Sequence, residues 1–283
     1  MAEAAFTLSA FGDEIADDLD EQLAVLRELR IGFLELRGAW GKNVLQVDDE
    51  EAAAVRRACQ ARGTGVSCIG SPIGKSPIVE PIERELANLA RICRIAEAVG
   101  TRRARVFSFY PPEGGDPQVH LEAATDRLAR MAELARREGV LLLLENERGI
   151  VGDTPERCAA LLGAVDSPSL RFVWDPANFV QVKVERSVER GWPLLGPYVA
   201  HVQIKDALLD DGTVLPAGEG DAQVGELLER LREASYRGFL ALEPHLAYAG
   251  PRGGFSGPAG MARAAAALRD LLRSRGCAER ATA

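Results

Sequence analysis

The fold of this chain is decided by one stretch of its sequence, Gly139-Val140-Leu141-Leu142-Leu143-Leu144-Glu145-Asn146-Glu147. A continuous aliphatic run of this length is typical of a parallel strand that is covered on both faces. The run ends in a carboxylate, and burying a carboxylate costs free energy unless a cation or a hydrogen-bond donor compensates. The stretch therefore predicts a buried strand whose carboxyl end meets a charged or donating partner at Glu145.

The same pattern recurs three times further along the chain. Each recurrence is an apolar, strand-like run with an oxygen-bearing side chain at or near its carboxyl end. The three runs are 170–175, 198–206 and 238–243, and their oxygen-bearing residues are Asp175, Gln203 and Glu243. Four predicted strands thus present an oxygen ligand in equivalent places.

Strand-like and helix-like segments alternate along the whole chain. Apolar residues at helical spacing follow the predicted strands, starting after Asp17 and Asp18, which mark the beginning of the first helix. The predicted strands are 6–11, 32–38, 66–70, 103–110, 139–145, 170–175, 198–206 and 238–243. The later predicted helices are 49–62, 81–99, 117–137, 155–163, 224–234 and one ending near Arg275, with a looser segment at 187–195.

This alternation predicts an α/β fold of the (β/α)8 TIM-barrel type, because parallel strands joined by right-handed crossovers close into a barrel at this length. No linker divides the sequence, so we expect residues 1–283 to form one domain with a flexible tail at 276–283. A doubly wound sheet is the alternative, but no G-x-G-x-x-G follows the first strand. In a barrel the four oxygen ligands would meet at the carboxyl ends of the strands.

Composition narrows the class of protein. A net charge of −8 and a pI near 5.2 offer no basic surface for phosphates, so we expect no nucleic-acid partner. The five cysteines are scattered without a C-x-x-C pair, which indicates reduced thiols rather than a disulfide framework or a thiolate zinc site. No apolar run is long enough to span a membrane, and the first residues do not resemble a signal peptide. We therefore expect a cytoplasmic protein without membrane contact.

The four strand-end groups suggest a metal site. Two glutamates, an aspartate and a glutamine supply oxygen donors only, which suits a hard divalent cation; Mn²⁺ is our first choice, with Mg²⁺ or Co²⁺ as alternatives. For any one acid, capping a strand or pairing with Arg37, Arg148 or Lys205 is an equally good explanation. A metal between two carboxylates can hold the carbonyl and adjacent hydroxyl of a ketose while a carboxylate moves the carbon-bound proton through an enediolate.

At this point the chain resembles a known family, the sugar phosphate isomerase/epimerase branch of the xylose isomerase-like TIM-barrel superfamily, over essentially its whole length. The resemblance implies a divalent ion held by Glu145, Asp175, Gln203 and Glu243, with Glu145 and Glu243 also transferring the proton. The motifs that resemble the family are Phe11–Ile15, Glu35–Gly38, Gly70–Lys75, Glu145-Asn146, Asp175–Asn178, His201–Asp206 and Glu243-Pro244.

Two positions depart from the commoner family pattern. Many relatives have His-x-His where this chain has His201 and Gln203. We keep Gln203 as the ligand; His201, on the same strand face, could ligate instead only if the metal sat one pleat deeper. Epimerase relatives often carry a histidine where this chain has Asn178. The residues that we expect to contact substrate are Lys205, Asn178, His201, Lys75, Arg37 and His245.

The sequence therefore predicts a metal-dependent isomerase or epimerase of a small sugar, sugar phosphate or hydroxy-keto acid, and a homo-oligomer is one assembly that we consider. One alternative is a metal-dependent dehydratase of the inosose dehydratase type, which would expel a β-hydroxyl from the enediolate. Another is a barrel that binds a sugar without turning it over. An apurinic-site endonuclease needs a histidine-rich zinc cluster, and this chain has only 3 histidines.

Overall fold

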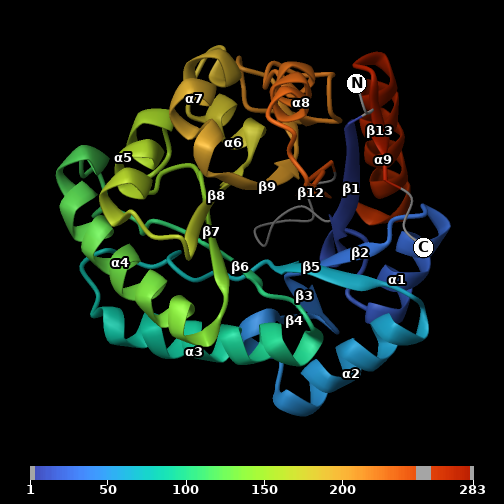
Figure 1. The fold of residues 1–283 in the computed structure, drawn as a ribbon, viewed down its shortest axis with the longest axis horizontal. Coiled ribbons are helices and arrows are strands. Elements are labelled where there is room, and N and C mark those ends of the chain that lie inside the picture. The colour runs from blue at the N-terminus through green and yellow to red at the C-terminus, as the bar shows by residue number, and fades with distance from the viewer. Residues whose placement is uncertain (1–3, 247–255, 281–283) are drawn as a thin grey trace.

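The computed structural model describes residues 4–246 and 256–280, which form a closed barrel of parallel strands surrounded by helices (Figure 1). Around the barrel the strands follow the order β1-β2-β5-β6-β7-β8-β9-β12, and β12 pairs with β1 to close it. The bounds are β1 (Ala4–Phe11), β2 (Phe33–Leu36), β5 (Gly65–Ile69), β6 (Arg103–Val106), β7 (Leu141–Glu145), β8 (Leu170–Trp174), β9 (Val199–Ile204) and β12 (Phe239–Leu242). The predicted single-domain (β/α)8 barrel is confirmed.

The register brings the carboxyl ends of the strands to the same rim. Glu145 at the end of β7 lies opposite Val173 of β8, and Gln203 of β9 lies opposite Ala241 of β12. Because all neighbouring strands run parallel, every strand-end side chain is delivered to one mouth of the barrel.

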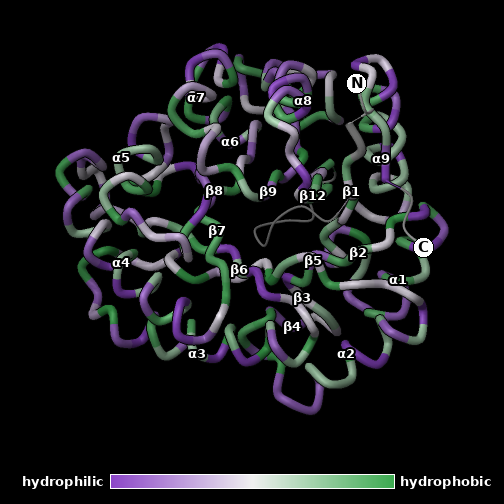
Figure 2. The backbone as a smooth tube through the Cα atoms, viewed as in Figure 1, coloured by the Kyte–Doolittle hydropathy of each residue, from purple (hydrophilic) through white to green (hydrophobic). Residues whose placement is uncertain are grey.

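At least one helix follows each barrel strand. Two helices lie between β8 and β9, and the second of them is a regular helix where we expected a looser segment. The helices are α1 (Leu19–Glu28), α2 (Asp49–Ala61), α3 (Ile82–Val99), α4 (Leu121–Glu138), α5 (Pro155–Val165), α6 (Pro176–Gln181), α7 (Ser187–Leu195), α8 (Val224–Glu233) and α9 (Gly257–Ser274). In Figure 2 hydrophobic and hydrophilic residues alternate along these helices, as one face packs on the barrel.

Local sequence explains where several helices begin and end. The Asp18 side chain accepts a hydrogen bond from the Glu21 N–H at 3.0 Å and caps α1, as the sequence predicts. Asp48 and Glu51 form a capping box at the start of α2. Gly139 ends α4 with a φ of 65°, a left-handed conformation that suits glycine, and the chain then enters β7.

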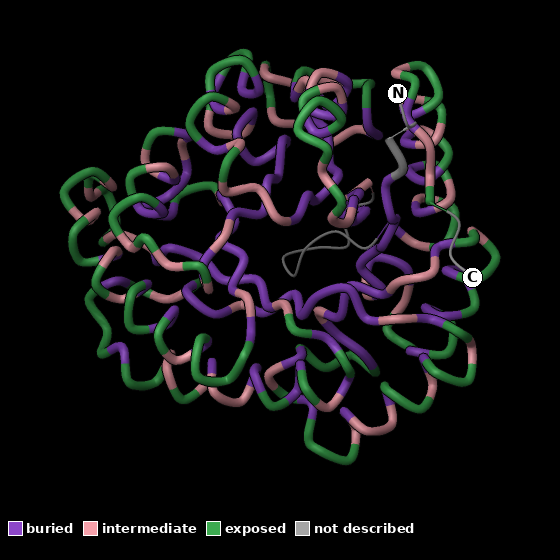
Figure 3. Tube along the Cα trace, in the orientation of Figure 1, coloured by how far each residue is buried: buried purple, intermediate pink, exposed green. Residues whose placement is uncertain are grey.

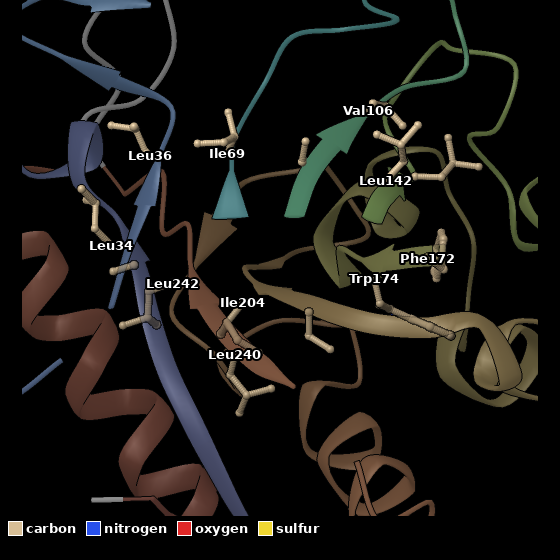
Figure 4. Packing of buried hydrophobic residues seen from close by; sticks show 14 of the residues in the cluster. Leu34, Leu36, Ile69, Val106, Leu142, Phe172, Trp174, Ile204, Leu240 and Leu242 are labelled. Carbon is tan, nitrogen blue, oxygen red and sulfur yellow. The ribbon is translucent and has the colours of Figure 1, made fainter. Parts of the chain in front are cut away.

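The core has two parts, one on each side of the strands. Leu142 and Leu144 of β7 belong to the large apolar cluster between strands and helices, whereas Leu143 packs inside the barrel with Cys68 and Val173. Figure 4 shows the outer part, and Figure 3 shows buried residues along the strands with exposed ones on the outer faces of the helices. The strand is thus covered on both faces, and Glu145 shares the inward face of Leu143.

Other details also differ from the sequence prediction. β6 ends at Val106 rather than Tyr110, because the Phe107 and Phe109 N–H groups donate to carbonyl oxygens of Ile73 and Gly74 and leave the sheet. Two short hairpins, β3–β4 (Gly38–Ala39, Lys42–Asn43) and β10–β11 (Asp206–Ala207, Val214–Leu215), lie in the loops after β2 and β9.

The C-terminal tail also differs from the expectation. Cys277–Glu279 form a strand, β13, that pairs in parallel with Ala4–Phe6 of β1, so this part of the predicted flexible tail is ordered by backbone hydrogen bonds to the sheet. Residues 281–283 of that tail lie outside the described residues. Among the helices described, none combines the length and apolarity that crossing a membrane requires.

Candidate metal and active site

Three of the predicted ligands meet at the mouth of the barrel. Glu145, Asp175 and Glu243 come from the ends of β7, β8 and β12, and each offers an oxygen that lies within 4.8 Å of the others. Their exposed fractions are 2%, 0% and 3%, so three carboxylates are buried at one point. Burying three carboxylates together costs folding free energy unless cations or hydrogen-bond donors offset the negative charge.

Asn146 and Asn178 fix the geometry of this cluster. The Asn146 side chain donates to the Asp175 carbonyl oxygen at 2.8 Å and accepts from its N–H at 3.0 Å, which ties the ends of β7 and β8 together. Asp175 caps α6 by accepting from the Asn178 N–H at 3.0 Å. The Asn178 amide in turn donates to Glu145 Oε1 at 3.1 Å. Asn178 therefore borders the candidate site through the carboxylate of Glu145, and its contact with substrate stays a prediction.

Gln203 completes the set. It is fully buried on β9, and its amide lies 2.9 and 3.1 Å from the two oxygens of Glu145, where its nitrogen donates to them. Turning the amide by half a turn would direct its oxygen to the same place. The four ligands predicted from the sequence are therefore neighbours.

In the part of the chain that the structure describes, three cations lie beside the carboxylates. Lys205 Nζ lies 2.8 Å from Asp175 Oδ2 and 3.6 Å from Glu243 Oε2. The Arg37 guanidinium donates to Glu243 Oε1 at 2.6 Å. Arg105 Nη1 lies 3.1 Å from Glu145 Oε2 and 3.7 Å from Glu243 Oε1.

Arg105 was missed by the sequence analysis. Its guanidinium is buried between the rings of Phe11 and Phe107, at 5.3 and 4.9 Å from their centroids. The available signal was the alternation of Arg103 and Arg105 within an apolar strand, which places both on one face. Charged side chains on alternate positions of a barrel strand indicate the interior, where they need partners.

The carboxylates differ in electrostatic environment. Burial raises the pKa of Glu145 to about 8, although Arg105 opposes this, and the charges of Glu243 and Asp175 add to the rise. Burial also raises the pKa of Asp175 against the effect of Lys205. Burial would raise the pKa of Glu243 too, but Lys205, His245 and the two arginines together hold it below its ordinary value.

The donor set fits a hard divalent cation. Glu145, Asp175, Gln203 and Glu243 supply oxygen ligands of the kind that Mn²⁺ and Mg²⁺ prefer. Among the described residues, Asp175 Oδ2 and Glu243 Oε2 are buried and accept no hydrogen bond, although Lys205 lies near both. Both oxygens have Lys205 as an ionic neighbour, and each carboxylate oxygen keeps a further lone pair that a cation can use.

Two predicted substrate contacts lie at the rim of the site. The Lys75 ammonium pairs with Glu147 and lies over the Phe107 ring at 4.4 Å from its centroid. His245 Nε2 lies 3.0 Å from Glu14 Oε1 and 3.7 Å from Glu243 Oε1, with a quarter of its side chain exposed. His245 therefore borders the carboxylate cluster, and Lys75 is paired with a residue two positions after Glu145.

His201 is not brought to the site. It is fully buried inside the barrel, where its Nε2 lies 3.1 Å from Glu35 Oε1 and its ring packs near Phe239. Ser67 also donates to Glu35, at 2.6 Å. His201 thus belongs to the layer beneath Gln203, and the geometry does not support direct contact with substrate.

A (β/α)8 barrel with a buried carboxylate cluster at the carboxyl ends of its strands defines the class of this protein. Residues 23–271 match the xylose isomerase-like TIM barrel family, and the chain belongs to that family. Among solved structures, a D-tagatose 3-epimerase-like protein superposes with a TM-score of 0.75 at 18% identity, covering 95% of this chain and 98% of that one. A xylose isomerase-like TIM barrel protein from Mycobacterium smegmatis in complex with magnesium gives 0.70 at 18% identity, covering 98% and 100%. At these identities the likeness shows a shared fold.

Two curated relatives are similar in sequence. A protein from Homo sapiens named "Putative hydroxypyruvate isomerase" is 24% identical over 69% of this chain and 75% of its own length. The uncharacterized protein MJ1311 of Methanocaldococcus jannaschii is 30% identical over 41% of this chain and 41% of its own length. The match thus spans less than half of the second relative.

Proposed function

We propose that this protein is a divalent-metal-dependent isomerase or epimerase that moves a proton at the carbon next to a carbonyl in a small sugar or hydroxy-keto acid. The observation that carries the proposal is the convergence of three buried carboxylates from three strand ends, with oxygens within 4.8 Å of one another. The name of the human relative, which specifies an isomerase of a hydroxy-keto acid, is consistent with this class of reaction.

The residues that would hold the metal are Glu145, Asp175, Gln203 and Glu243, with Mn²⁺ as our first choice. When bound, the cation would hold the carbonyl and neighbouring hydroxyl oxygens of the substrate and offset the charge that develops on them. Binding would require the Gln203 amide to present its oxygen rather than its nitrogen. It would also displace the proton of Glu145, since a carboxylate must be ionised to act as a ligand.

The chain itself would supply the proton transfer and the positioning. Glu145 and Glu243 approach from β7 and β12 and serve as the proton-transferring pair. Lys205, held between Asp175 and Glu243, is placed to donate to a substrate oxygen beside them. The burial of the cluster excludes bulk water from the reacting carbon.

Metal content is the first test. After loading with Mn²⁺ and dialysis, elemental mass spectrometry should find about one ion per chain. Asp175→Ala should lose the ion, whereas Asp153→Asn, which removes a carboxylate paired with Arg157, should retain it. A wild-type protein without metal would leave the carboxylates as partners of Lys205 and the arginines and would count against the proposal.

Proton transfer is the second test. In deuterated water with Mn²⁺, a substrate from a panel of ketoses, aldoses and hydroxy-keto acids should gain solvent deuterium at the carbon next to its carbonyl. Glu145→Gln and Glu243→Gln should abolish this exchange while the protein stays folded. A dehydrated, ultraviolet-absorbing product would instead assign the protein to the lyases, and binding without exchange would assign it a sugar-binding role.

A further inference from the structure

Glu14 is a fully buried carboxylate that the proposed reaction does not use. It closes the short 3-10 helix η1 (Gly12–Glu14) after β1 and has an exposed fraction of 0%. Its Oε1 lies 2.8 Å from Arg37 Nη2 and 3.0 Å from His245 Nε2. Its Oε2 accepts from the His245 N–H at 3.2 Å and from the Ser256 hydroxyl at 2.9 Å. One carboxylate therefore gathers donors from three separate segments of the chain.

Arg37 connects Glu14 directly to Glu243. Its three guanidinium nitrogens are divided among three carboxylates: Nε donates to Asp13 at 2.6 Å, Nη2 to Glu14 at 2.8 Å and Nη1 to Glu243 Oε1 at 2.6 Å. The guanidinium also lies over the Phe11 ring, 4.7 Å from its centroid. A planar guanidinium that donates hydrogen bonds from all three nitrogens has little freedom to rotate.

His245 provides a second connection. Its backbone adopts a φ of 45°, an unusual conformation for a residue with a side chain, and its N–H donates to Glu14. Its Nε2 lies between Glu14 Oε1 at 3.0 Å and Glu243 Oε1 at 3.7 Å. Glu14 thus contacts both Arg37 and His245, the two side chains that approach Glu243 Oε1 from the β1 side of the barrel.

The consequence is that the two oxygens of Glu243 are not equivalent. Oε1 faces Arg37, Arg105 and His245, whereas Oε2 is buried toward Lys205 and accepts no hydrogen bond from the described residues. A carboxylate anchored through one oxygen presents the other in a defined direction.

We propose that Glu14 is a positioning residue that acts through Arg37 and His245 to hold Glu243 Oε1, so that Oε2 faces the cation and the substrate. The inference rests on the proposed function, because it assigns Glu243 as a metal ligand and proton-transfer group. Without Glu14, Arg37 and His245 would each lose a partner that fixes them beside Glu243 Oε1, so Oε2 would no longer be held in one direction. Glu243 would then be a less well positioned ligand and base.

The test is Glu14→Gln, which keeps the shape of the side chain and removes its charge. The dissociation constant for Mn²⁺, measured from the electron paramagnetic resonance of free Mn²⁺, should rise about tenfold, as is common for partners that orient metal ligands. With a substrate in hand, kcat should fall while KM changes less, because the defect lies in the proton-transfer group. A purely structural loss would lower the melting temperature without this split.

Glu147→Gln serves as the comparator for a simple field effect. Glu147 is a carboxylate that acts electrostatically on both Glu145 and Lys205, but it pairs with Lys75 and not with Arg37. We expect its removal to change the Mn²⁺ dissociation constant less than threefold. Equal effects of the two variants would mean that charge alone matters and would overturn the positioning role of Glu14.

The outcomes separate this inference from the proposed function. If the wild-type protein binds no Mn²⁺, the proposed function fails. If the wild type binds and a folded Glu14→Gln protein binds equally well, the role of Glu14 fails and the proposed function stands. If Glu14→Gln does not fold, Glu14→Asp is the second variant, because it keeps the charge but moves it away from Arg37 by about one methylene. An unchanged dissociation constant for Mn²⁺ in Glu14→Asp would also overturn the positioning role of Glu14.

Discussion

The ammonium of Lys205 lies 2.8 Å from Asp175 Oδ2, and both side chains are almost completely buried. Despite burial, which opposes a charged amine, Asp175, Glu243 and other nearby acids raise the pKa of Lys205 above its ordinary value. The protein therefore keeps a permanent cation next to the carboxylates that we propose as metal ligands. This ammonium and a bound metal would stabilise the same negative charges.

Replacing Lys205 by methionine should make the fold depend on metal. Removal of one partner of a buried ion pair typically costs about 3–5 kcal/mol of unfolding free energy. A divalent cation would supply the missing positive charge, so the difference in melting temperature between Mn²⁺ and chelator should be larger in Lys205→Met than in the wild type. Scanning calorimetry in both conditions measures this, and equal differences in the two proteins would contradict it.

Metal affinity should increase with pH. The pKa of Glu145 is raised to about 8, so at neutral pH this carboxyl is mostly protonated before metal binds. Binding must release that proton, and the apparent affinity should rise by up to tenfold per pH unit below about pH 8 and then level off. Calorimetric titration at pH 7 in buffers of different ionisation enthalpy should show release of about one proton per ion. A flat profile from pH 6 to 8 would be inconsistent with this environment for Glu145.

His201→Phe should destabilise the fold without removing the metal site. Burial opposes the ionisation of Glu35, but His201 and Ser67 hold its pKa below the ordinary value, so this pairing stabilises the fold at neutral pH and is lost as the pH falls. Leaving Glu35 with the Ser67 hydroxyl but without the imidazole should lower the unfolding free energy by about 3–5 kcal/mol in urea denaturation. Metal content should stay at the wild-type value; its loss would show that His201 acts at the site after all.

Arg105→Met should impair the site more than Arg105→Lys. Arg105 lies close to both Glu145 and Glu243. Lysine keeps the positive charge at this position, whereas the neutral methionine side chain removes it. We expect solvent deuterium exchange to fall by about 10- to 100-fold in the methionine variant, with partial retention in the lysine variant. Exchange rates measured at saturating Mn²⁺ separate a loss of proton transfer from weaker metal binding. Full activity in Arg105→Met would rule out a role for the Arg105 guanidinium.

The order of elements and the meeting of the strand-end acids could be predicted from the sequence for a simple physical reason. Residue spacing within one strand or helix reports which of its faces is buried, and Asp18 or Gly139 marks a helix end through its own backbone preference. Parallel strands then place their carboxyl ends on one rim whatever the packing details are. Glu145, Asp175 and Glu243 therefore needed only correct strand ends to be brought together.

Side-chain depth and partners were decided by the tertiary structure. His201 and Gln203 share one face of β9, and only the stagger of the barrel shows that His201 lies beside Glu35 while Gln203 reaches Glu145. Arg37 could have paired with Glu35 on its own strand, but it reaches Asp13, Glu14 and Glu243 instead. The pair of Arg37 and Glu243 joins residues 206 positions apart in the sequence.

Local periodicity thus determined the barrel and the rim on which its acids gather, because both follow from strand direction and residue alternation. The closed sheet determined which cation meets which carboxylate, because that depends on the register between strands and on the distances across the barrel mouth. Arg105 and Glu14 show the difference: each is an ordinary charged residue in the sequence, and each becomes a partner of the site only once β1, β6 and β12 converge.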